Sequence, residues 1–313
     1  MEIIETTSKE YKNILPQPYH FFNSVQFTEL NADKCDRVFY LLFKDSKIRL
    51  GLIVGEMGQT AYTPFSAPFG GFSVVKDYIH MNDIDECVNI LIQWCKEKCL
   101  KGVRITLPPS IYGESFISMQ YNSFIRNGFS IENNDLNFSF CEQKFNDQYE
   151  NILWRNARKN LTVAFSYDLK FYHCVNNAEK ETAYEIIKKN REARGFPLRM
   201  TWSQVFETIK IIPNDFFLVK DSDSNTIASA IVFHVSIDIV QVVYWGDLAE
   251  YSHLKSMNFL SYKLFDYYHN QNVKIVDIGP STENSTPNYG LCDFKSSIGC
   301  DIQSKFTFYI DLR

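Results

Sequence analysis

Several features that define common protein classes are scarce or missing in this sequence. None of the 8 cysteines lies in a Cys-x-x-Cys pair, so free thiols are expected rather than a disulfide scaffold or a metal site. The 6 histidines show no metal-ligand spacing either. No apolar run reaches the roughly 18 residues that a membrane helix needs. The N-terminus also has no signal-peptide pattern, so we expect a cytoplasmic protein without a membrane span.

An excess of positive charge is also missing. The chain has 32 Lys and Arg against 37 Asp and Glu, a net charge of −5. This balance excludes a globally basic nucleic-acid coat and leaves room only for local basic patches. A hydrophobic fraction of 45% allows sizeable cores. Aromatic residues reach 15%, with 26 Phe beside only 13 Gly, which favours a substantial β component.

The same order of predicted elements occurs in both halves of the chain. Three strands, a helix, a strand, a helix and a strand are expected over 37–43, 48–56, 60–65, 84–100, 102–107, 121–127 and 136–140. They are expected again over 215–221, 226–235, 237–246, 256–271, 273–279, 289–297 and 305–310. The pattern indicates a duplication, although two similar units can also agree by chance.

The second half has additional elements before its strands. A short strand over 169–175 and helices over 178–193 and 201–212 give the order β-α-α-β-β-β-α-β-α-β. We therefore expect an N-terminal domain over 1–145, a connecting helix within 146–168, and a C-terminal domain over 169–313.

That order resembles the GNAT acyltransferase fold, and two tandem copies resemble the FemAB-like peptidyltransferases. The resemblance is carried by YWGDLAEYSHLKSMNFLSYKLFDYYHNQNVKIVDIGPS followed by NYGLCDFKSSIGC. It is similar to the Fem pattern of a strand ending in Asp-x-Gly and then Gly-Leu-x-x-Phe-Lys-x-x-x-Gly. The basic run 155–160 and the loop SAPFGGF also look like Fem segments. The resemblance implies an α+β fold of two GNAT-like domains, each a mixed, mostly antiparallel sheet flanked by helices.

The implied activity is transfer of an acyl or aminoacyl group onto an amine of a small molecule or peptide. The donor would be acyl-CoA or aminoacyl-tRNA, with no other cofactor bound. GNAT domains that bind coenzyme A hold its diphosphate in a glycine-rich loop, whereas the matching segment 247–256 has no glycine and two acids. The excess of acidic over basic residues gives little support to a tRNA-bound donor. Both donors therefore stay open, and the sequence gives no indication of the oligomeric state.

Two residues are the catalytic candidates. The resemblance implies that Lys295 places positive charge at the acyl carbonyl or at a phosphate, and an exposed helix lysine is the alternative. Asp277 ends an apolar strand, where burial would make it a stronger base; a turn-capping acid is the alternative. From the sequence alone, Lys295→Ala is expected to abolish transfer while leaving the thermal midpoint nearly unchanged.

Substrate-binding candidates lie at helix ends, strand ends and the loop that follows the Asp277 strand. They are Arg194, Arg199, Tyr244, Trp245, Asn258, Ser281, Asn284 and Tyr289. The two arginines can bind a carboxylate or phosphate bidentately, or can belong to a solvated helix end. The aromatic residues can line a ligand site or pack in the core, while Asn258 can bind an anion or cap its helix. The basic residues of the connecting helix, Arg155, Arg158 and Lys159, are either site residues or a charged surface.

A second class of function remains open beside the transferase. Because a fold does not fix a function, the chain can also be a catalytically silent tandem module that binds a small ligand or a protein partner. The missing glycine loop is the observation that favours this alternative.

Overall fold

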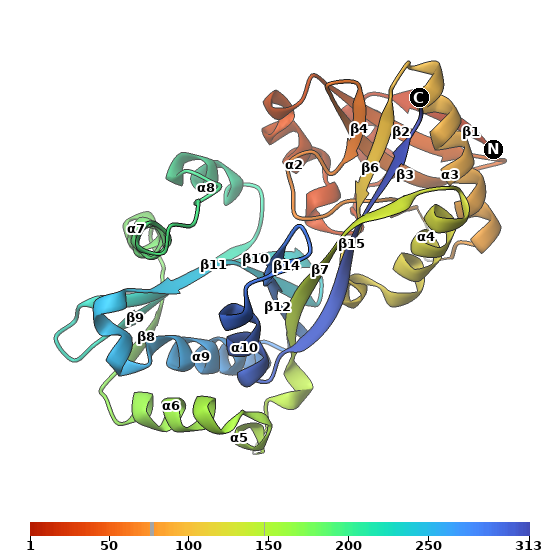
Figure 1. Ribbon diagram of the computed structural model, residues 1–313. Coiled ribbons are helices and arrows are strands. Elements are labelled where there is room, and N and C mark those ends of the chain that lie inside the picture. The colour runs from red at the N-terminus through yellow and green to blue at the C-terminus, as the bar shows by residue number, and fades with distance from the viewer. Residues whose placement is uncertain (76–77, 147) are drawn as a thin grey trace. The chain divides into compact units, whose positions relative to one another are not determined.

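The computed structural model describes residues 1–75, 78–146 and 148–313 and contains two compact units (Figure 1). Unit 1 comprises Met1–Asp135 together with Gln303–Arg313, and unit 2 comprises Leu136–Ile302. The unit boundary therefore lies upstream of the expected boundary at residue 145. The segment expected to connect two domains belongs to unit 2, and the last 11 residues of the chain belong to unit 1.

Unit 1 contains a sheet with the strand order β1-β2-β3-β4-β6-β15. Its elements are β1 (Glu2–Thr6), α1 (Ser8–Ile14), α2 (Val25–Leu30), β2 (Arg37–Lys44), β3 (Ile48–Met57), β4 (Thr60–Thr63), β5 (Ser73–Val74), α3 (Met81–Glu97), β6 (Gly102–Thr106), α4 (Glu114–Arg126) and the start of β7 (Ser130–Cys141). The sequence analysis missed β1, α1 and α2. With them, the helices and the longer strands follow the same order in both repeats. The two-residue strand β5 occurs only in the first repeat, and the short hairpin of β13 (Thr282–Glu283) and β14 (Thr286–Pro287) occurs only in the second.

Unit 2 contains a sheet with the strand order β7-β12-β11-β10-β9-β8. Its elements are α5 (Tyr149–Ile152), α6 (Arg155–Phe165), β8 (Lys170–His173), α7 (Asn177–Ala193), α8 (Trp202–Thr208), β9 (Asn214–Lys220), β10 (Thr226–Ser236), β11 (Ile239–Asp247), α9 (Ser256–Asn270), β12 (Ile275–Pro280), β13 (Thr282–Glu283), β14 (Thr286–Pro287), α10 (Tyr289–Ser297) and the start of β15 (Asp301–Asp311). The predicted order of this repeat is confirmed, with the small β13–β14 hairpin added.

The helices of unit 2 cover both faces of its sheet. In Figure 1, α7 lies over one face of β9, β10 and β11, and α9 lies over the other face with α6 outside it. The side of α9 that faces the sheet carries apolar residues about one turn apart, such as Leu260, Leu264 and Tyr268, which are buried in the unit 2 core. This packing fixes the ends of β11 and β12, where the candidate site lies.

The two repeats exchange their last strands. Strand β7, which ends the first repeat, pairs antiparallel with β12, so that Val276 lies opposite Phe140. Strand β15, which ends the second repeat, pairs antiparallel with β6, so that Phe308 lies opposite Ile105. Both strands carry similar apolar alternation, so the sequence pattern alone cannot assign each strand to its sheet.

Candidate functional site

Strands β11 and β12 of unit 2 run parallel and then separate. Their paired register runs from Ile239–Ile275 to Gln241–Asp277 and stops there, although β11 continues to Asp247. We call this divergence the splay. Alternate backbone groups of a strand point toward each neighbouring strand, so β11 beyond Gln241 presents backbone N–H and C=O groups that have no partner on β12.

The corresponding parallel strands of unit 1, β4 and β6, also separate, but a loop fills the gap. Their register ends at Thr63–Ile105. The backbone N–H of Gly70 then donates to the carbonyl oxygen of Thr106 (2.8 Å), and that of Gly71 donates to Thr63 Oγ1 (3.2 Å). The SAPFGGF loop thus bridges β4 and β6 in unit 1, which makes the splay of unit 2 the better candidate site.

Lys295 of α10 is buried at the end of β12. Its side-chain amine donates to the backbone carbonyls of Ile278 (2.7 Å), Gly279 (2.8 Å) and Pro280 (3.1 Å). Gly279 has a φ of +68°, a conformation that turns the chain and that other residues adopt at a cost. Burial lowers the pKa of Lys295 to about 8. An ammonium group has three N–H donors, and the protein uses all three here.

Asp277 is fully buried on β12 and is also bonded within the protein. One carboxylate oxygen accepts from Asn137 Nδ2 (2.7 Å) and from the backbone N–H of Gly279 (2.9 Å). The other accepts from Gln241 Nε2 (2.9 Å). These bonds join β7, β11 and β12 at the point where the splay begins. The two catalytic candidates therefore lie together in one frame, at the base of the splay.

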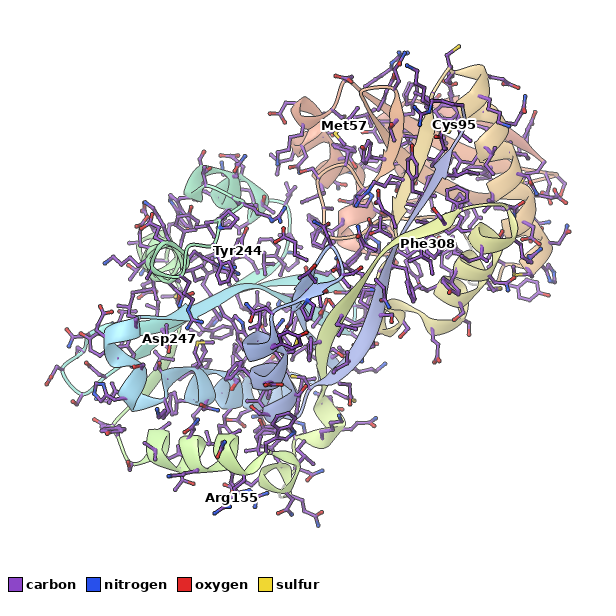
Figure 2. All side chains as sticks on the ribbon, viewed as in Figure 1. Met57, Cys95, Arg155, Tyr244, Asp247 and Phe308 are labelled. Atoms are coloured by element: carbon purple, nitrogen blue, oxygen red, sulfur yellow. The ribbon has the colours of Figure 1, made fainter. Side chains whose placement is uncertain are left out.

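A third charged residue, Asp247, lies at the far end of β11 (Figure 2). Its Oδ2 accepts from Ser256 Oγ at the first residue of α9 (3.0 Å), and its Oδ1 lies 3.5 Å from the Arg194 guanidinium. Burial raises the pKa of Asp247 above its ordinary value, although the Ser256 hydrogen bond and the charge of Arg194 oppose this. Asp247 was not among the residues predicted from the sequence.

Arg191 on α7 is the other residue that the sequence analysis missed. Its guanidinium lies 5.9 Å from the ring centroid of Tyr244 and, within the described residues, has no carboxylate partner and no hydrogen bond. Burial lowers the pKa of Arg191, and the charges of Arg194 and Arg199 add to the lowering. The helical spacing could have identified it, because Arg191 follows the buried Ile187 by one turn.

The predicted arginines differ in their contacts. Arg194 is exposed and reaches Asp247 only at 3.5 Å, while Arg199 forms an exposed ion pair with Glu283 (2.5 Å). Exposed ion pairs hold their partners weakly. Together with Arg191, these two side chains form a group of three cations near Tyr244, which we call the arginine group. A group of this kind is suited to bind a carboxylate or a phosphate.

The other predicted substrate-binding residues lie either in the packed interior of unit 2 or near the start of α10. Tyr244 and Asn258 are buried, and Trp245 is half-buried against Phe294 of α10, with ring centroids 5.9 Å apart. Ser281 and Asn284 belong to the segment between β12 and α10, and Tyr289 is the first residue of α10. Asn284 and Tyr289 are exposed, whereas the Ser281 hydroxyl is buried and, within the described part of the chain, has no hydrogen-bond partner.

Gly246 determines how closely β11 and α7 approach each other. A Cβ at this position would lie 2.7 Å from Asn190 Cγ, and Asn190 Nδ2 donates to the carbonyl oxygen of Asp247 (2.7 Å). Gly246→Ala is therefore expected to lower the free energy of unfolding by about 1–3 kcal/mol, because the core must rearrange. Urea unfolding measures this change.

The control is Gly290→Ala, since the nearest atom to a Cβ there lies 3.8 Å away. Gly290 is in α10, where alanine favours helix formation, so no loss of stability is expected. An equal loss in both variants would contradict the role of the close approach at Gly246.

Over residues 1–75, 78–146 and 148–313, no group of three or more His, Cys, Asp or Glu side chains is placed to hold a metal ion. Within the same ranges no helix combines the length and apolar character needed to cross a membrane. The basic residues Arg155, Arg158 and Lys159 lie exposed on α6, and Arg158 donates to the carbonyl oxygen of Glu150 (2.8 Å).

The comparisons with known proteins establish the fold. No family model matches the sequence, and no curated protein matches it. Among solved structures, FemX is similar with a TM-score of 0.70 at 12% identity, over 99% of this chain and 97% of that one. L-PGS from Bacillus licheniformis has a TM-score of 0.61 at 12% identity, over 99% and 93%.

A tandem GNAT protein from the clavulanic acid biosynthesis pathway has a TM-score of 0.53 at 10% identity, over 100% of this chain and 98% of that one. The chain therefore has an α+β tandem GNAT fold of the kind found in FemX. The predicted fold class and the resemblance to FemAB-like proteins are confirmed at the level of the fold.

Proposed function

We propose that this protein is an acyl- or aminoacyltransferase that joins an activated acyl group to an amine at the splay of unit 2. The observation that carries the proposal is the separation of β11 from β12 beyond Gln241 and Asp277. It leaves backbone N–H groups of β11 without a strand partner. Such groups can stabilise the oxyanion that develops when an amine attacks an ester or thioester carbonyl.

The frame at the base of the splay supports this assignment. Lys295 donates hydrogen bonds to three consecutive backbone carbonyls at the end of β12. Asp277 accepts hydrogen bonds from Asn137 on β7, from Gln241 on β11 and from the backbone N–H of Gly279. Acyl transfer from an activated donor depends mainly on positioning two substrates, and a rigid strand end provides that positioning. Lys295 and Asp277 are therefore proposed to be positioning residues, with Lys295 also contributing positive charge near the reacting carbonyl.

We propose an aminoacyl ester, as in aminoacyl-tRNA, as the donor rather than acyl-CoA. The segment before α9 has no glycine, and a six-residue 3-10 helix, Ala249–Leu254, occupies it. At the first residue of α9, Ser256 Oγ donates a hydrogen bond to Asp247 Oδ2 (3.0 Å). The N-terminus of a helix is the position that suits a diphosphate. Because the Asp247 carboxylate already lies there, binding of the coenzyme A diphosphate is disfavoured.

The arginine group supports an anionic substrate. Within the described residues, the half-buried guanidinium of Arg191 has no carboxylate partner, and such a group is costly unless a ligand pairs with it. We propose that it binds a carboxylate or phosphate of the amine acceptor, with Arg194 and Arg199 beside it. Tyr244 lies against Arg191 of this group, whereas Trp245 points to the opposite face of β11 and packs against Phe294. Trp245, Ser281, Asn284, Tyr289 and Asn258 are proposed to contact the other parts of the substrates.

Thermal unfolding with a panel of compounds tests the proposed function. The panel contains bulk aminoacyl-tRNA, uncharged tRNA, acetyl-CoA and glycylglycine, which carries both an amine and a carboxylate. Ligands that bind the folded state raise its midpoint. Stabilisation by the charged tRNA and by glycylglycine, with transfer of the aminoacyl group between them, is expected. Stabilisation by glycylglycine alone, without transfer, would instead indicate the silent binding module.

Arg191→Met tests the arginine group. Loss of a charged hydrogen bond to the acceptor is expected to raise its KM by about 10–100-fold, because such a bond contributes about 1.5–3 kcal/mol. The kcat is expected to change little, since the contact lies away from the reacting atoms. The matched control is Arg37→Met in unit 1, where a guanidinium also lies over an aromatic ring, 5.1 Å from the Phe39 centroid. An unchanged KM in Arg191→Met would contradict the proposed contact.

A further inference from the structure

One surface segment of unit 2 carries positive charge that the protein does not neutralise. Residues 151–167, which include α6, contain Arg155, Arg158 and Lys159 and no Asp or Glu, in a chain whose net charge is −5. All three side chains are exposed. Within the described residues none of them forms an ion pair. Arg158 bonds only to backbone carbonyls such as that of Glu150 (2.8 Å), so its positive charge also remains uncompensated.

The fold of α6 places these cations on the outer side of the helix. They are spaced three and four residues apart or adjacent, so they share one side of it. The other side carries Ala157, Leu161 and Ala164, which are buried in the unit 2 core. Figure 1 shows that α6 lies outside α9 in this unit. Of the two acids that flank the segment, Asp168 lies 3.5 Å from Lys170, so Glu150 alone opposes the three cations along this stretch of chain.

Large apolar side chains are exposed at both ends of the same helix. They are Ile152 and Trp154 before its first residue, Phe165 at its last residue and Tyr167 beyond it. Trp154 is 51% exposed, although its backbone N–H donates to the carbonyl oxygen of Ser297 at the end of α10 (3.0 Å). These side chains are therefore displayed by ordered backbone. Apolar groups gathered on a surface in this way mark an interaction site.

We propose that this surface docks on an anionic lipid bilayer. We call it the α6 face and define it by Trp154, Arg155, Arg158, Lys159 and Phe165. Cations next to a bilayer attract anionic headgroups and strengthen binding by roughly fivefold each. Tryptophan and phenylalanine side chains insert at the level of the headgroups. The α6 face combines both features, and its assignment does not depend on the proposed transfer reaction.

RNA is the competing occupant, because it is also an anion. Protein contacts to nucleic acids are made mostly to the phosphates by polar and charged groups, so RNA gives no role to the exposed Ile152 and Phe165. A long polyanion is also repelled by a chain of net charge −5. A bilayer surface uses the cations and the apolar side chains together, and for this reason the observations favour it.

Sedimentation with lipid vesicles tests the proposal. Vesicles of phosphatidylcholine alone are compared with vesicles of equal parts phosphatidylcholine and phosphatidylglycerol. The protein is expected to bind the anionic vesicles at least about tenfold more tightly. This preference should weaken between about 50 mM and about 300 mM salt, because salt screens exposed charges.

A pair of double variants locates the binding surface. Arg155→Ser with Lys159→Ser is expected to weaken binding to the anionic vesicles by about 30-fold. Arg158 is kept because it bonds to backbone carbonyls. The matched control is Lys9→Ser with Lys12→Ser, which removes the same charge from two exposed lysines one turn apart on or beside α1 of unit 1. The control is expected to bind as the wild type does, and urea unfolding verifies that both variants fold.

Trp154 provides a readout that nonspecific attraction would not move. Anionic vesicles with brominated acyl chains should quench the tryptophan fluorescence of the wild type, because the Trp154 ring enters the interface. Trp154→Phe keeps an aromatic ring and should still bind, but its fluorescence should not be quenched. The other tryptophans, Trp94, Trp202 and Trp245, are less exposed, so they remain away from the lipid.

The results separate the α6 face from the alternatives. The proposal is overturned if the wild type does not sediment with the anionic vesicles, if both double variants weaken binding equally, or if Trp154→Phe is quenched like the wild type. An α6 variant that keeps its vesicle binding but loses binding to uncharged tRNA would assign the surface to nucleic acid instead. Transfer measured without vesicles is expected to be unchanged in the α6 variant, so the proposed function stands or falls separately.

Discussion

Replacing Lys295 by alanine is expected to lower the free energy of unfolding of unit 2 by about 3 kcal/mol, because buried carbonyls lose their donors and a cavity remains. The amine is 2% exposed and bonds to the carbonyls of Ile278, Gly279 and Pro280. This replaces the expectation, based on sequence alone, that Lys295→Ala would spare the thermal midpoint. Loss of transfer is expected to accompany the loss of stability, since the carbonyls at the end of β12 would no longer be held.

Urea unfolding followed by tryptophan fluorescence measures this change. Three of the four tryptophans, Trp154, Trp202 and Trp245, belong to unit 2, so the signal reports mainly on that unit. Lys274→Met is the control, because Lys274 is 68% exposed and forms one ion pair with Asp238. Its loss should change the stability far less than the loss of Lys295, because an exposed ion pair contributes little. A Lys295→Ala variant as stable as this control would contradict the framework role.

The pH dependence gives a second test of Lys295. Burial lowers its pKa in the folded protein to about 8, from an ordinary value of 10.5. Between these values the unfolded chain binds more protons than the folded one, so the stability of the wild type should rise with pH in this range. The gain is on the order of 3 kcal/mol and should be missing in Lys295→Ala. If the free energies of unfolding of the two proteins differ by the same amount from pH 8 to 10.5, a desolvated amine is excluded.

The second large effect is expected for Asp277→Ala, which leaves three donors without an acceptor: Asn137 Nδ2, Gln241 Nε2 and the backbone N–H of Gly279. An unsatisfied buried donor costs about 1–3 kcal/mol. A total loss of about 3 kcal/mol or more is therefore expected. The beginning of the splay should lose its shape, and transfer should fall with it.

Asp277→Asn separates this framework role from acid–base chemistry. The amide keeps one acceptor oxygen but directs its NH₂ group at a donor, so an intermediate loss of stability is expected. Asp238→Ala is the control, because the Asp238 side chain is 45% exposed and, within the described residues, its carboxylate bonds only to Lys274 in an ion pair. A stable Asp277→Ala protein that has lost only its activity would show that Asp277 is instead the base.

Local signals predicted much of the fold. The helix expected over 289–297 coincides with α10, Tyr289–Ser297, because Asn288 caps it and a strand signal precedes it. The helix expected over 84–100 is α3, which begins earlier, at Met81, and ends at Glu97. In the structure His80 is at the cap position, and Asp83 closes the capping box by accepting from the backbone N–H of His80. Helix α4 begins at Glu114 rather than near Tyr121, since its first turns have fewer apolar residues in a regular pattern.

Other features depended on contacts between residues that are far apart in the sequence. The short segments β1, α1 and α2 lack a strong periodic pattern, and α1 depends on the burial of Tyr11 against strands that follow it. Whether Asp247, Asp277 or Lys295 is free or bonded depends on partners such as Asn137 and Ser256. No local pattern in the sequence contains that information.

The sequence by itself determined the repeated order of strands and helices, since hydrophobic periodicity and turn residues are local. It also determined the type of fold, through the motif that contains Phe294 and Lys295 and ends at Gly299. The tertiary structure decided which sheet each final strand joins, because β7 and β15 have similar apolar patterns and differ only in the neighbour that each finds. It also separated the framework pair Lys295 and Asp277 from Asp247, since burial and bonding arise only when distant strands meet.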